Sequence, residues 1–177
     1  MNILVDGPQG SGKSTQAAML AFKLKVPHIQ MGEILRNISL INDSKTVEVI
    51  KEAMNEGELV PLEINATLVN KRLRLNDCKN GFVLDGFPRN DQQLERLESK
   101  LDKVFYLKIS DEEGIKRLLL RKRADDNEET IKQRLSIYHS QTEPVLEIFR
   151  QDGILEEIDG ERSIEEIHTD ILERVKQ

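Results

Sequence analysis

Short apolar runs alternate with longer amphipathic stretches along this chain. The runs lie at residues 3–5, 82–84, 104–109 and 154–158, and a fifth short strand is predicted around 27–30. Continuous apolar runs of this length are typical of strands buried on both faces, and the stretches between them predict helices. The pattern therefore predicts an α/β fold, a three-layer sandwich with a parallel sheet of about five strands flanked by helices.

Amphipathic patterning also fixes the expected helices. After the first strand, a helix over residues 14–24 is predicted to turn Ala18, Leu20, Ala21 and Leu24 towards the sheet. Residues 30–82 hold a mostly helical insertion, longer than a plain crossover helix requires. The remaining helices are expected at 32–41, 44–56, 61–76, 111–121, 127–150 and 164–175.

A glycine-rich loop follows the first strand directly. Residues 7–15 read Gly-Pro-Gln-Gly-Ser-Gly-Lys-Ser-Thr and match the phosphate-binding pattern G-x-x-x-x-G-K-[ST]. In such a loop the backbone N–H groups surround phosphate oxygens, the lysine adds a positive charge, and the hydroxyl reaches Mg²⁺. The motif predicts a P-loop NTPase fold, with a nucleoside triphosphate bound by Gly10, Ser11, Gly12, Lys13, Ser14 and Thr15.

A second motif ends the strand at 82–84. The segment Gly81-Phe82-Val83-Leu84-Asp85-Gly86-Phe87-Pro88-Arg89 places an acid and an arginine after the apolar run. Carboxyl ends of parallel strands meet at one edge of a sheet, so Asp85 and Arg89 are expected beside the phosphate loop. Asp85 can orient the water shell of Mg²⁺, and Arg89 can bind a phosphoryl group through two N–H groups.

Composition limits the possible partners. The 177 residues suit a single domain, and the net charge of −6 disfavours nucleic acid and anionic membrane surfaces as partners. A single cysteine, Cys78, excludes an internal disulfide framework and fits a reducing compartment. The sequence lacks a span of about 18 apolar residues. Its first residues lack a signal-peptide pattern, so a cytoplasmic protein is expected.

The two motifs in this order resemble the adenylate kinase family of nucleoside monophosphate kinases, and the resemblance extends over essentially the whole chain. Met31-Gly32-Glu33-Ile34-Leu35-Arg36 stands where the family has its monophosphate-binding loop, and 57–61 resembles the segment that forms the acceptor base pocket. The resemblance implies transfer of the ATP γ-phosphate to AMP with Mg²⁺. It also implies that residues 31–60 form a monophosphate-binding insertion within one domain, 1–177.

The resemblance assigns roles residue by residue. Gln93 stands four residues after Arg89, where adenylate kinases place the glutamine that pairs with adenine. The implied AMP site comprises Met31, Arg36, Glu58, Leu59, Val60, Gly86, Phe87, Pro88, Arg89, Gln93, Arg123 and Arg134. ATP is assigned to the loop together with Arg117, Arg121 and Arg162, and catalysis to Lys13, Asp85, Arg89, Arg123 and Arg134. Mg²⁺ is expected on phosphates and water near Ser14 and Asp85, without a protein cage.

The chain departs from the family in two places. Met31 replaces the usual threonine, which exchanges a hydroxyl for a thioether and loosens the expected base selectivity. Between Arg121 and Arg123 only Lys122 remains where relatives carry a lid, so 121–126 is a vestigial lid. Water exclusion is then expected to come from movement of residues 31–60, from helix ends or from a neighbouring subunit.

Three functions remain open at this point. The leading one is an ATP:AMP phosphotransferase acting as a monomer or small homo-oligomer. A UMP/CMP or broad-specificity kinase is favoured by the short lid and by Asn90 directly after Arg89, and is opposed by Gln93. The third, a nucleotide-binding regulatory module without turnover, is disfavoured because ATP binding alone needs no second phosphate clamp at Arg36 and Arg89.

Overall fold

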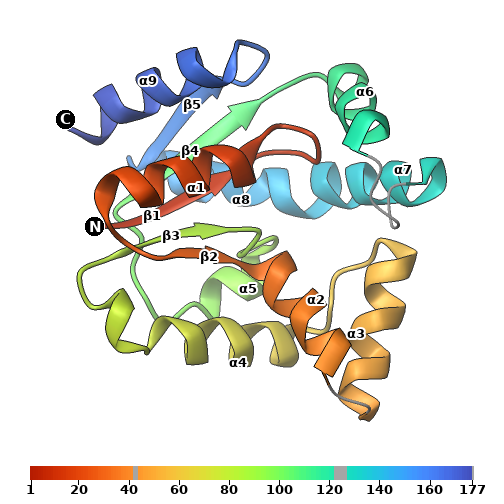
Figure 1. The fold of residues 1–177 in the computed structure, drawn as a ribbon. Helices are drawn as coiled ribbons and strands as arrows, with labels where there is room; N and C mark the ends of the chain where they lie inside the picture. The colour runs from red at the N-terminus through yellow and green to blue at the C-terminus, as the bar shows by residue number, and fades with distance from the viewer. Residues whose placement is uncertain (42–43, 122–126, 177) are drawn as a thin grey trace.

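Five parallel strands form one sheet in the computed structural model, which describes residues 1–41, 44–121 and 127–176. The strands are β1 (Asn2–Asp6), β2 (His28–Gln30), β3 (Phe82–Asp85), β4 (Lys103–Lys108) and β5 (Leu155–Asp159). Their order across the sheet is β2-β3-β1-β4-β5, with β1 at the centre. Figure 1 shows the helices arranged on both sides of this sheet, which confirms the predicted three-layer α/β fold.

Alternating side chains of the strands divide the core into two parts. Ile3 and Val5 of β1 face α1 (Lys13–Leu24) and α9 (Ile164–Val175), whereas Leu4 faces the opposite layer. That second layer contains α4 (Leu62–Leu73), α5 (Asp91–Glu95) and α8 (Glu143–Gln151). Because both faces of each central strand are covered, the strands read as continuous apolar runs.

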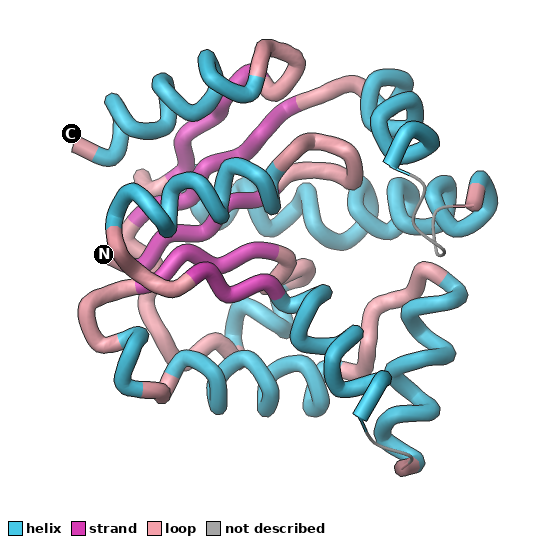
Figure 2. The backbone as a smooth tube through the Cα atoms, viewed as in Figure 1, coloured by secondary structure: helices cyan, strands magenta, loops and turns pink. Residues whose placement is uncertain are grey.

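The remaining helices extend beyond the carboxyl edge of the sheet (Figure 2). They are α2 (Met31–Ile41) and α3 (Lys45–Glu56), which belong to the insertion, and α6 (Asp111–Arg121) and α7 (Glu128–Ile137). A short 3₁₀ turn, Asn76–Cys78, leads into β3. Figures 1 and 2 show the two pairs of helices on either side of the space at the ends of β1 and β3.

Local capping explains several helix starts. The Ser44 and Ser163 side chains accept hydrogen bonds from the N–H groups of Val47 and Glu166, and Ser163 with Glu166 completes a capping box. Asn127 likewise accepts from the N–H of Thr130 at the start of α7. Polar side chains at these positions satisfy N–H groups that have no partner within the helix.

Two details of the predicted helices are wrong. Ala18 is exposed, and Ala17 takes its place on the buried face, because the sheet-facing row runs i, i+3, i+4, i+7 through Ala17, Leu20, Ala21 and Leu24. The expected single helix over 127–150 is interrupted by a π-helical turn, Tyr138–Thr142. Pro144 at the start of α8 lacks an N–H group and so cannot continue the α-helical hydrogen bonding of α7.

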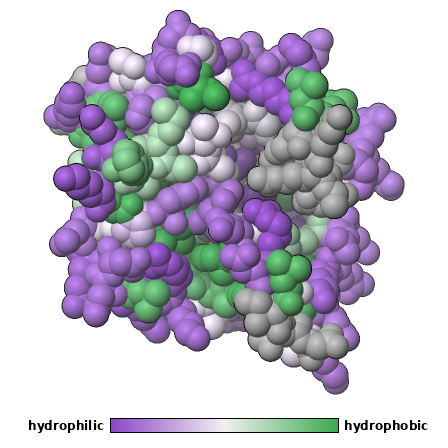
Figure 3. Space-filling model, in the orientation of Figure 1, coloured by the Kyte–Doolittle hydropathy of each residue, from purple (hydrophilic) through white to green (hydrophobic). Residues whose placement is uncertain are grey.

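The exposed surface is predominantly polar. Figure 3 shows hydrophilic residues over most of one face, with apolar residues in small separate areas. Phe22 is the most exposed of the large apolar side chains, at 87 %. Among the described residues no helix combines the length and the apolar character that crossing a bilayer demands.

Replacing Leu20 by alanine tests the sheet-facing side of α1. Leu20 is fully buried, so we expect the free energy of unfolding to fall by about 2–5 kcal/mol. Phe22→Ala on the same helix removes an exposed ring and is expected to change stability by less than about 0.5 kcal/mol. Urea unfolding followed by circular dichroism measures both, and equal losses would show that α1 is packed differently.

Candidate functional site

The phosphate loop begins where β1 ends and closes on itself. The N–H of Ser11 donates to the carbonyl of Pro8 at 3.1 Å, and Lys13 Nζ donates to the same carbonyl at 3.2 Å. Gly10 and Gly12 have φ angles of 87° and 85°, which glycine adopts without strain. At Gly10 a Cβ atom would also lie 2.4 Å from the carbonyl oxygen of Gly114 in α6. Glycine is therefore required at this position for both conformation and packing.

The parallel register of β1 with β3 brings the second motif to the loop. Val5 pairs with Asp85, so both strands end at the same level. Ser14 Oγ donates to Asp85 Oδ2 at 2.5 Å, and Gln30 Nε2 at the end of β2 donates to Ser14 Oγ at 2.9 Å. Three neighbouring segments thus share one polar network, as the predicted meeting of Asp85 with the loop requires.

The environment of Asp85 favours its charged form. Its side chain is 2 % exposed, and His28 Nε2 lies 3.8 Å from Asp85 Oδ2. Burial opposes ionisation, but the nearby His28, the positive charge of Lys13 and the hydrogen bond from Ser14 lower the pKa of Asp85 below its usual value. Asp85 is consequently a carboxylate at neutral pH.

Hydrogen bonds to its backbone hold Arg89 in place shortly after the end of β3. Gln93 Oε1 accepts from the N–H of Arg89 at 2.8 Å, and Thr142 Oγ1 donates to its carbonyl at 2.9 Å. Arg89 Nε donates to the carbonyl of Gly86 at 3.1 Å. Thr142 belongs to the π-helical turn, so the interruption between α7 and α8 supplies one of the contacts that position Arg89.

The insertion contributes the opposite wall of the site. α2 follows β2 without a break, which places Met31, 2 % exposed, next to Gln30. A Cβ atom on Gly32 would lie 3.3 Å from Arg36 Nη1, so the guanidinium of Arg36 lies close to the first turn of its own helix. Arg36 lines the same cavity as Asp85 and Gly86 at the end of β3.

Helix α7 contacts the insertion across the site. Arg134 Nη2 donates to the carbonyl of Met54 at 3.1 Å, and Gln133 Nε2 donates to Glu58 Oε1 at 2.5 Å. Thr130 Oγ1 donates to the carbonyl of Asn55 at 3.4 Å. These contacts join the two groups of helices that flank the end of the sheet.

These elements enclose a cavity of about 150 Å³. Twelve of the predicted site residues line it: Gly10, Lys13, Ser14, Met31, Arg36, Glu58, Leu59, Val60, Asp85, Gly86, Arg89 and Arg134. Sequence reasoning did not select Gln9, Gln30, Leu35, Met54 or Asn65, which also line it. No sequence motif marks Gln9 or Gln30 as a site residue. Gln9 stands at an unspecified position of the loop pattern, and Gln30 stands just before the monophosphate motif.

Other predicted residues lie outside the cavity lining. Ser11, Phe87, Pro88 and Gln93 are buried, whereas Thr15 is exposed. The first three buried residues support the loop and the turn after β3, and the amide oxygen of Gln93 is engaged by the backbone of Arg89.

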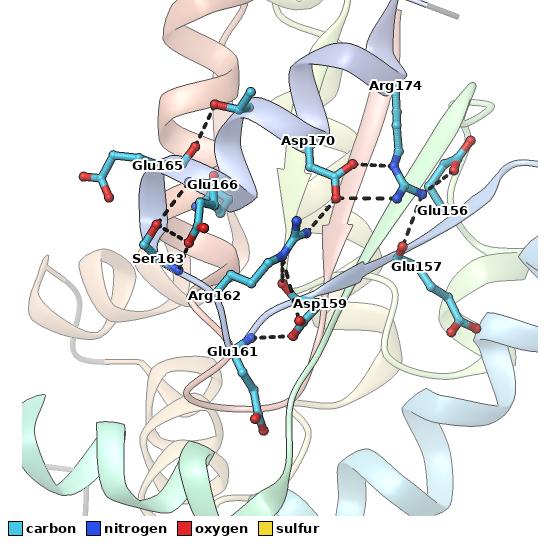
Figure 4. Close-up of polar contacts among 12 residues, drawn as sticks. Glu156, Glu157, Asp159, Glu161, Arg162, Ser163, Glu165, Glu166, Asp170 and Arg174 are labelled. Carbon is cyan, nitrogen blue, oxygen red and sulfur yellow. Dashed lines mark hydrogen bonds and ion pairs between the residues drawn. The ribbon is translucent and has the colours of Figure 1, made fainter.

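Arg117 and Arg162 have protein partners at the other end of the phosphate loop. Arg117 Nε donates to Glu113 Oε1 at 2.8 Å, and its Nη1 donates to the carbonyl of Gly160 at 2.9 Å. Arg162 Nη2 donates to Asp170 Oδ2 at 2.6 Å within an ion-pair network beside α9 (Figure 4). Their role in binding ATP stays a prediction. Arg123 and most of the predicted vestigial lid, 122–126, lie outside the described residues, as does the side chain of Arg121.

Asp6, the last residue of β1, is an acid that sequence reasoning did not select for the site. It is 5 % exposed, and burial raises its pKa to about 6. The N–H of Gly7 and the charges of Lys13 and Arg89 act in the opposite direction, and the carboxylate of Asp85 adds to the increase. A buried carboxyl group thus lies within the electrostatic range of the cations that line the cavity.

The glycine loop at the end of a central strand, in a parallel sheet of this order, defines a P-loop protein that binds nucleotide phosphates. A family model described as "Adenylate kinase" matches residues 5–154. The chain therefore belongs to the adenylate kinase family.

Curated relatives extend this assignment over almost the full length. An adenylate kinase from Thermobifida fusca is 43 % identical over 94 % of each chain, and one from Leptospira biflexa is 42 % identical over 96 % of each chain. An adenylate kinase from Archaeoglobus fulgidus is 33 % identical over 99 % of this chain and 100 % of its own. That alignment has 217 positions, so this relative carries residues that the 177-residue chain lacks.

Asp6→Asn should change how stability depends on pH. The folded-state pKa of Asp6, about 6, exceeds its ordinary value of 3.8, so the folded protein binds the proton more tightly than the unfolded chain. Ionisation of Asp6 therefore costs stability as pH rises from about 4 to 6, and up to about 3 kcal/mol is lost above that range. We expect Asp6→Asn to recover this loss at pH 7.5 and to gain almost nothing at pH 4.

Urea unfolding of both proteins between pH 4 and 7.5 measures the difference. Asp152→Asn, at an exposed carboxylate after α8, is the matched control. A gain from Asp6→Asn that is equal at all pH values would contradict the assignment of the proton to Asp6.

Proposed function

We propose that this protein transfers the γ-phosphate of ATP to AMP, reversibly and with Mg²⁺, to give two molecules of ADP. The observation that carries the proposal is one cavity with two separate groups of phosphate-binding residues. Lys13 follows the loop after β1, whereas Arg36 belongs to α2 and Arg89 follows β3, and all three line the cavity. A protein that only bound ATP would have no use for the second group.

In this proposal the protein acts by positioning and charge. Backbone N–H groups of the loop and Lys13 bind the ATP phosphates, while Arg36 and Arg89 hold the phosphate of AMP in line with them. Arg134 reaches the same cavity from α7, and Arg123 is proposed to join it. The arginines reduce repulsion between the two anionic nucleotides and stabilise the charge that spreads over the phosphoryl group during transfer.

The oxygen atoms near the loop fit Mg²⁺. Ser14 and Asp85 offer a hydroxyl and a carboxylate that are 2.5 Å apart, and Mg²⁺ prefers oxygen ligands with several waters. Mg²⁺ bound to ATP would neutralise developing charge on the phosphates. Gln30 donates a hydrogen bond to Ser14 from the β2 side, so it is proposed to keep the Ser14 hydroxyl oriented, and His28 lies 3.8 Å from Asp85 on the same side.

Adenine is the proposed acceptor base. Residues 57–60 and Met31 line the cavity, and Gln93 accepts from the N–H of Arg89 while its amide nitrogen has no hydrogen bond to the described residues. Asn90, which favoured a UMP/CMP kinase, caps α5 by accepting from the N–H of Gln93 at 2.8 Å. Because Asn90 is occupied in this way, the case for a pyrimidine acceptor is weaker.

Closure of the site is proposed to depend on α7. The contacts of Arg134, Gln133 and Thr130 with residues 54–58 cover the cavity on the side where relatives have a lid. We regard 1–177 as one domain, in which 31–60 binds the monophosphate and 121–126 is the reduced lid. The proposal also includes a cytoplasmic location and action as a monomer or small homo-oligomer.

A coupled assay of ADP formation tests the proposal. We expect turnover with ATP, Mg²⁺ and AMP, and much slower turnover when CMP, UMP or GMP replaces AMP. Preference for CMP or UMP would establish the alternative pyrimidine kinase. ATP binding without turnover of any of the four monophosphates would establish a regulatory module.

Arg89→Lys tests whether the reaction needs the planar guanidinium group or only its positive charge. Lysine keeps the positive charge but lacks the planar pair of N–H donors, so we expect kcat to fall by about two to three orders of magnitude. The backbone contacts of Arg89 with Gln93 and Thr142 remain, and folding should change little. Arg74→Lys, at an exposed pair with Glu98 outside the cavity, is the control. A variant Arg89→Lys with unchanged kcat would remove Arg89 from the phosphate site.

A further inference from the structure

Gln9 has an unusual environment within the phosphate loop. Its side chain is 8 % exposed and lines the cavity, together with Lys13 and Arg89. Its Oε1 atom is buried and accepts no hydrogen bond from any described residue, and its Nε2 atom donates none. Most buried amides in proteins have partners, because leaving one unpaired costs stability.

Contacts on both sides of Gln9 fix the backbone of the loop. The carbonyl of Pro8 accepts from both Ser11 and Lys13, which holds the preceding residue. On the other side, a Cβ atom on Gly114 would lie 2.8 Å from the Gln9 carbonyl, so the backbone lies against α6. The backbone of Gln9 is thus fixed where its side chain lines the cavity.

Gln9 lines the same cavity as the residues of both proposed phosphate groups. Gly10 and Lys13 belong to the group proposed to hold ATP, and Arg36 and Arg89 belong to the group proposed to hold AMP. A phosphoryl group that moves from one group to the other stays within the cavity that Gln9 lines. The oxygens of the phosphoryl group are strong hydrogen-bond acceptors, and an amide N–H is a suitable neutral donor for them.

We propose that Gln9 is a catalytic residue whose amide donates a hydrogen bond to the phosphoryl group in transit between ATP and AMP. This inference rests on the proposed phosphotransferase function. The Nε2 donor of Gln9 then has its acceptor in the substrate, whereas Oε1 is itself an acceptor and needs a donor such as water. The contact strengthens as charge develops on the transferred oxygens.

The variant Gln9→Met tests this role, because methionine keeps the length of the side chain and removes its polar atoms. We expect kcat to fall about ten- to hundredfold, with KM for ATP and AMP changed less than about threefold. The nucleotide-free variant should be at least as stable as the original protein, with Tm higher by about 2–8 °C, because a buried unpaired amide has been removed.

A binding measurement supplies a readout independent of turnover. ADP, AMP and Mg²⁺ with fluoroaluminate mimic the phosphoryl group in transit, and calorimetry gives the affinity for this mixture and for ATP alone. Gln9→Met should weaken the fluoroaluminate complex about tenfold or more while ATP affinity stays within about threefold.

Gln16→Met is the matched control, because Gln16 has an unpaired buried Oε1 as Gln9 does but its Nε2 has a protein partner. Gln16 is 1 % exposed, and its Nε2 donates to the carbonyl of Ile164 at 2.8 Å, away from the cavity. This variant should lose stability and keep kcat within about twofold.

Three results would overturn the role of Gln9. A lower Tm with unchanged kcat would assign the amide to structure, with water as its partner. A raised KM for one nucleotide with unchanged kcat would assign it to ground-state binding. Equal loss of affinity for the fluoroaluminate mixture and for ATP alone would also assign Gln9 to ground-state binding. If the original protein itself does not turn over AMP, the proposed function fails, and the affinities still decide whether Gln9 contacts the fluoroaluminate.

Discussion

The hydrogen bond between Ser14 and Asp85 is the contact around which the rest of the site is arranged. It joins the phosphate loop after β1 to the end of β3, at a distance of 2.5 Å. Parallel pairing of Val5 with Asp85 is what brings the two residues to the same level. Gln30 joins the same network from β2, so the ends of three adjacent strands determine where phosphate and metal would lie.

Positive side chains line the cavity around this network, and two acidic side chains are buried beneath them. The chain is acidic overall, with a net charge of −6, yet Lys13, Arg36, Arg89 and Arg134 converge on one cavity. Beneath them lie two buried acids that behave differently. Contacts with His28, Lys13 and Ser14 keep Asp85 charged, whereas burial raises the pKa of Asp6. Two carboxyl groups at the ends of adjacent strands therefore have different proton affinities because their immediate partners differ.

The π-helical turn between α7 and α8 follows from a proline and helps to position Arg89. Pro144 ends the α-helical bonding that would have continued from α7, and a π-helical turn results. The turn places Thr142 where its hydroxyl reaches the carbonyl of Arg89. The same segment continues α7, whose Arg134 and Gln133 contact residues 54–58 of the insertion. A local break in helical bonding thus helps to position an arginine and links the two walls of the cavity.

Much of the fold could be predicted from the sequence because its signals are local. The buried strands are continuous apolar runs, and the loop after β1 has a fixed pattern of glycines, lysine and hydroxyls. These signals depend on residues that are close in the chain, and they located the strands, the phosphate loop, and the helices except for the short α5 and the break at 138–142.

Tertiary structure decided the features that depend on contacts between distant segments. No local sequence pattern predicts the unpaired amide oxygen of Gln9 or the raised pKa of Asp6. The same is true of the hydrogen bonds by which Gln93 and Thr142 hold the backbone of Arg89. Burial and hydrogen bonding arise when strands 80 residues apart come together, as β1 and β3 do through Asn2 and Phe82. The sequence by itself thus determined the class of nucleotide site, and packing decided which polar groups are left for the substrate.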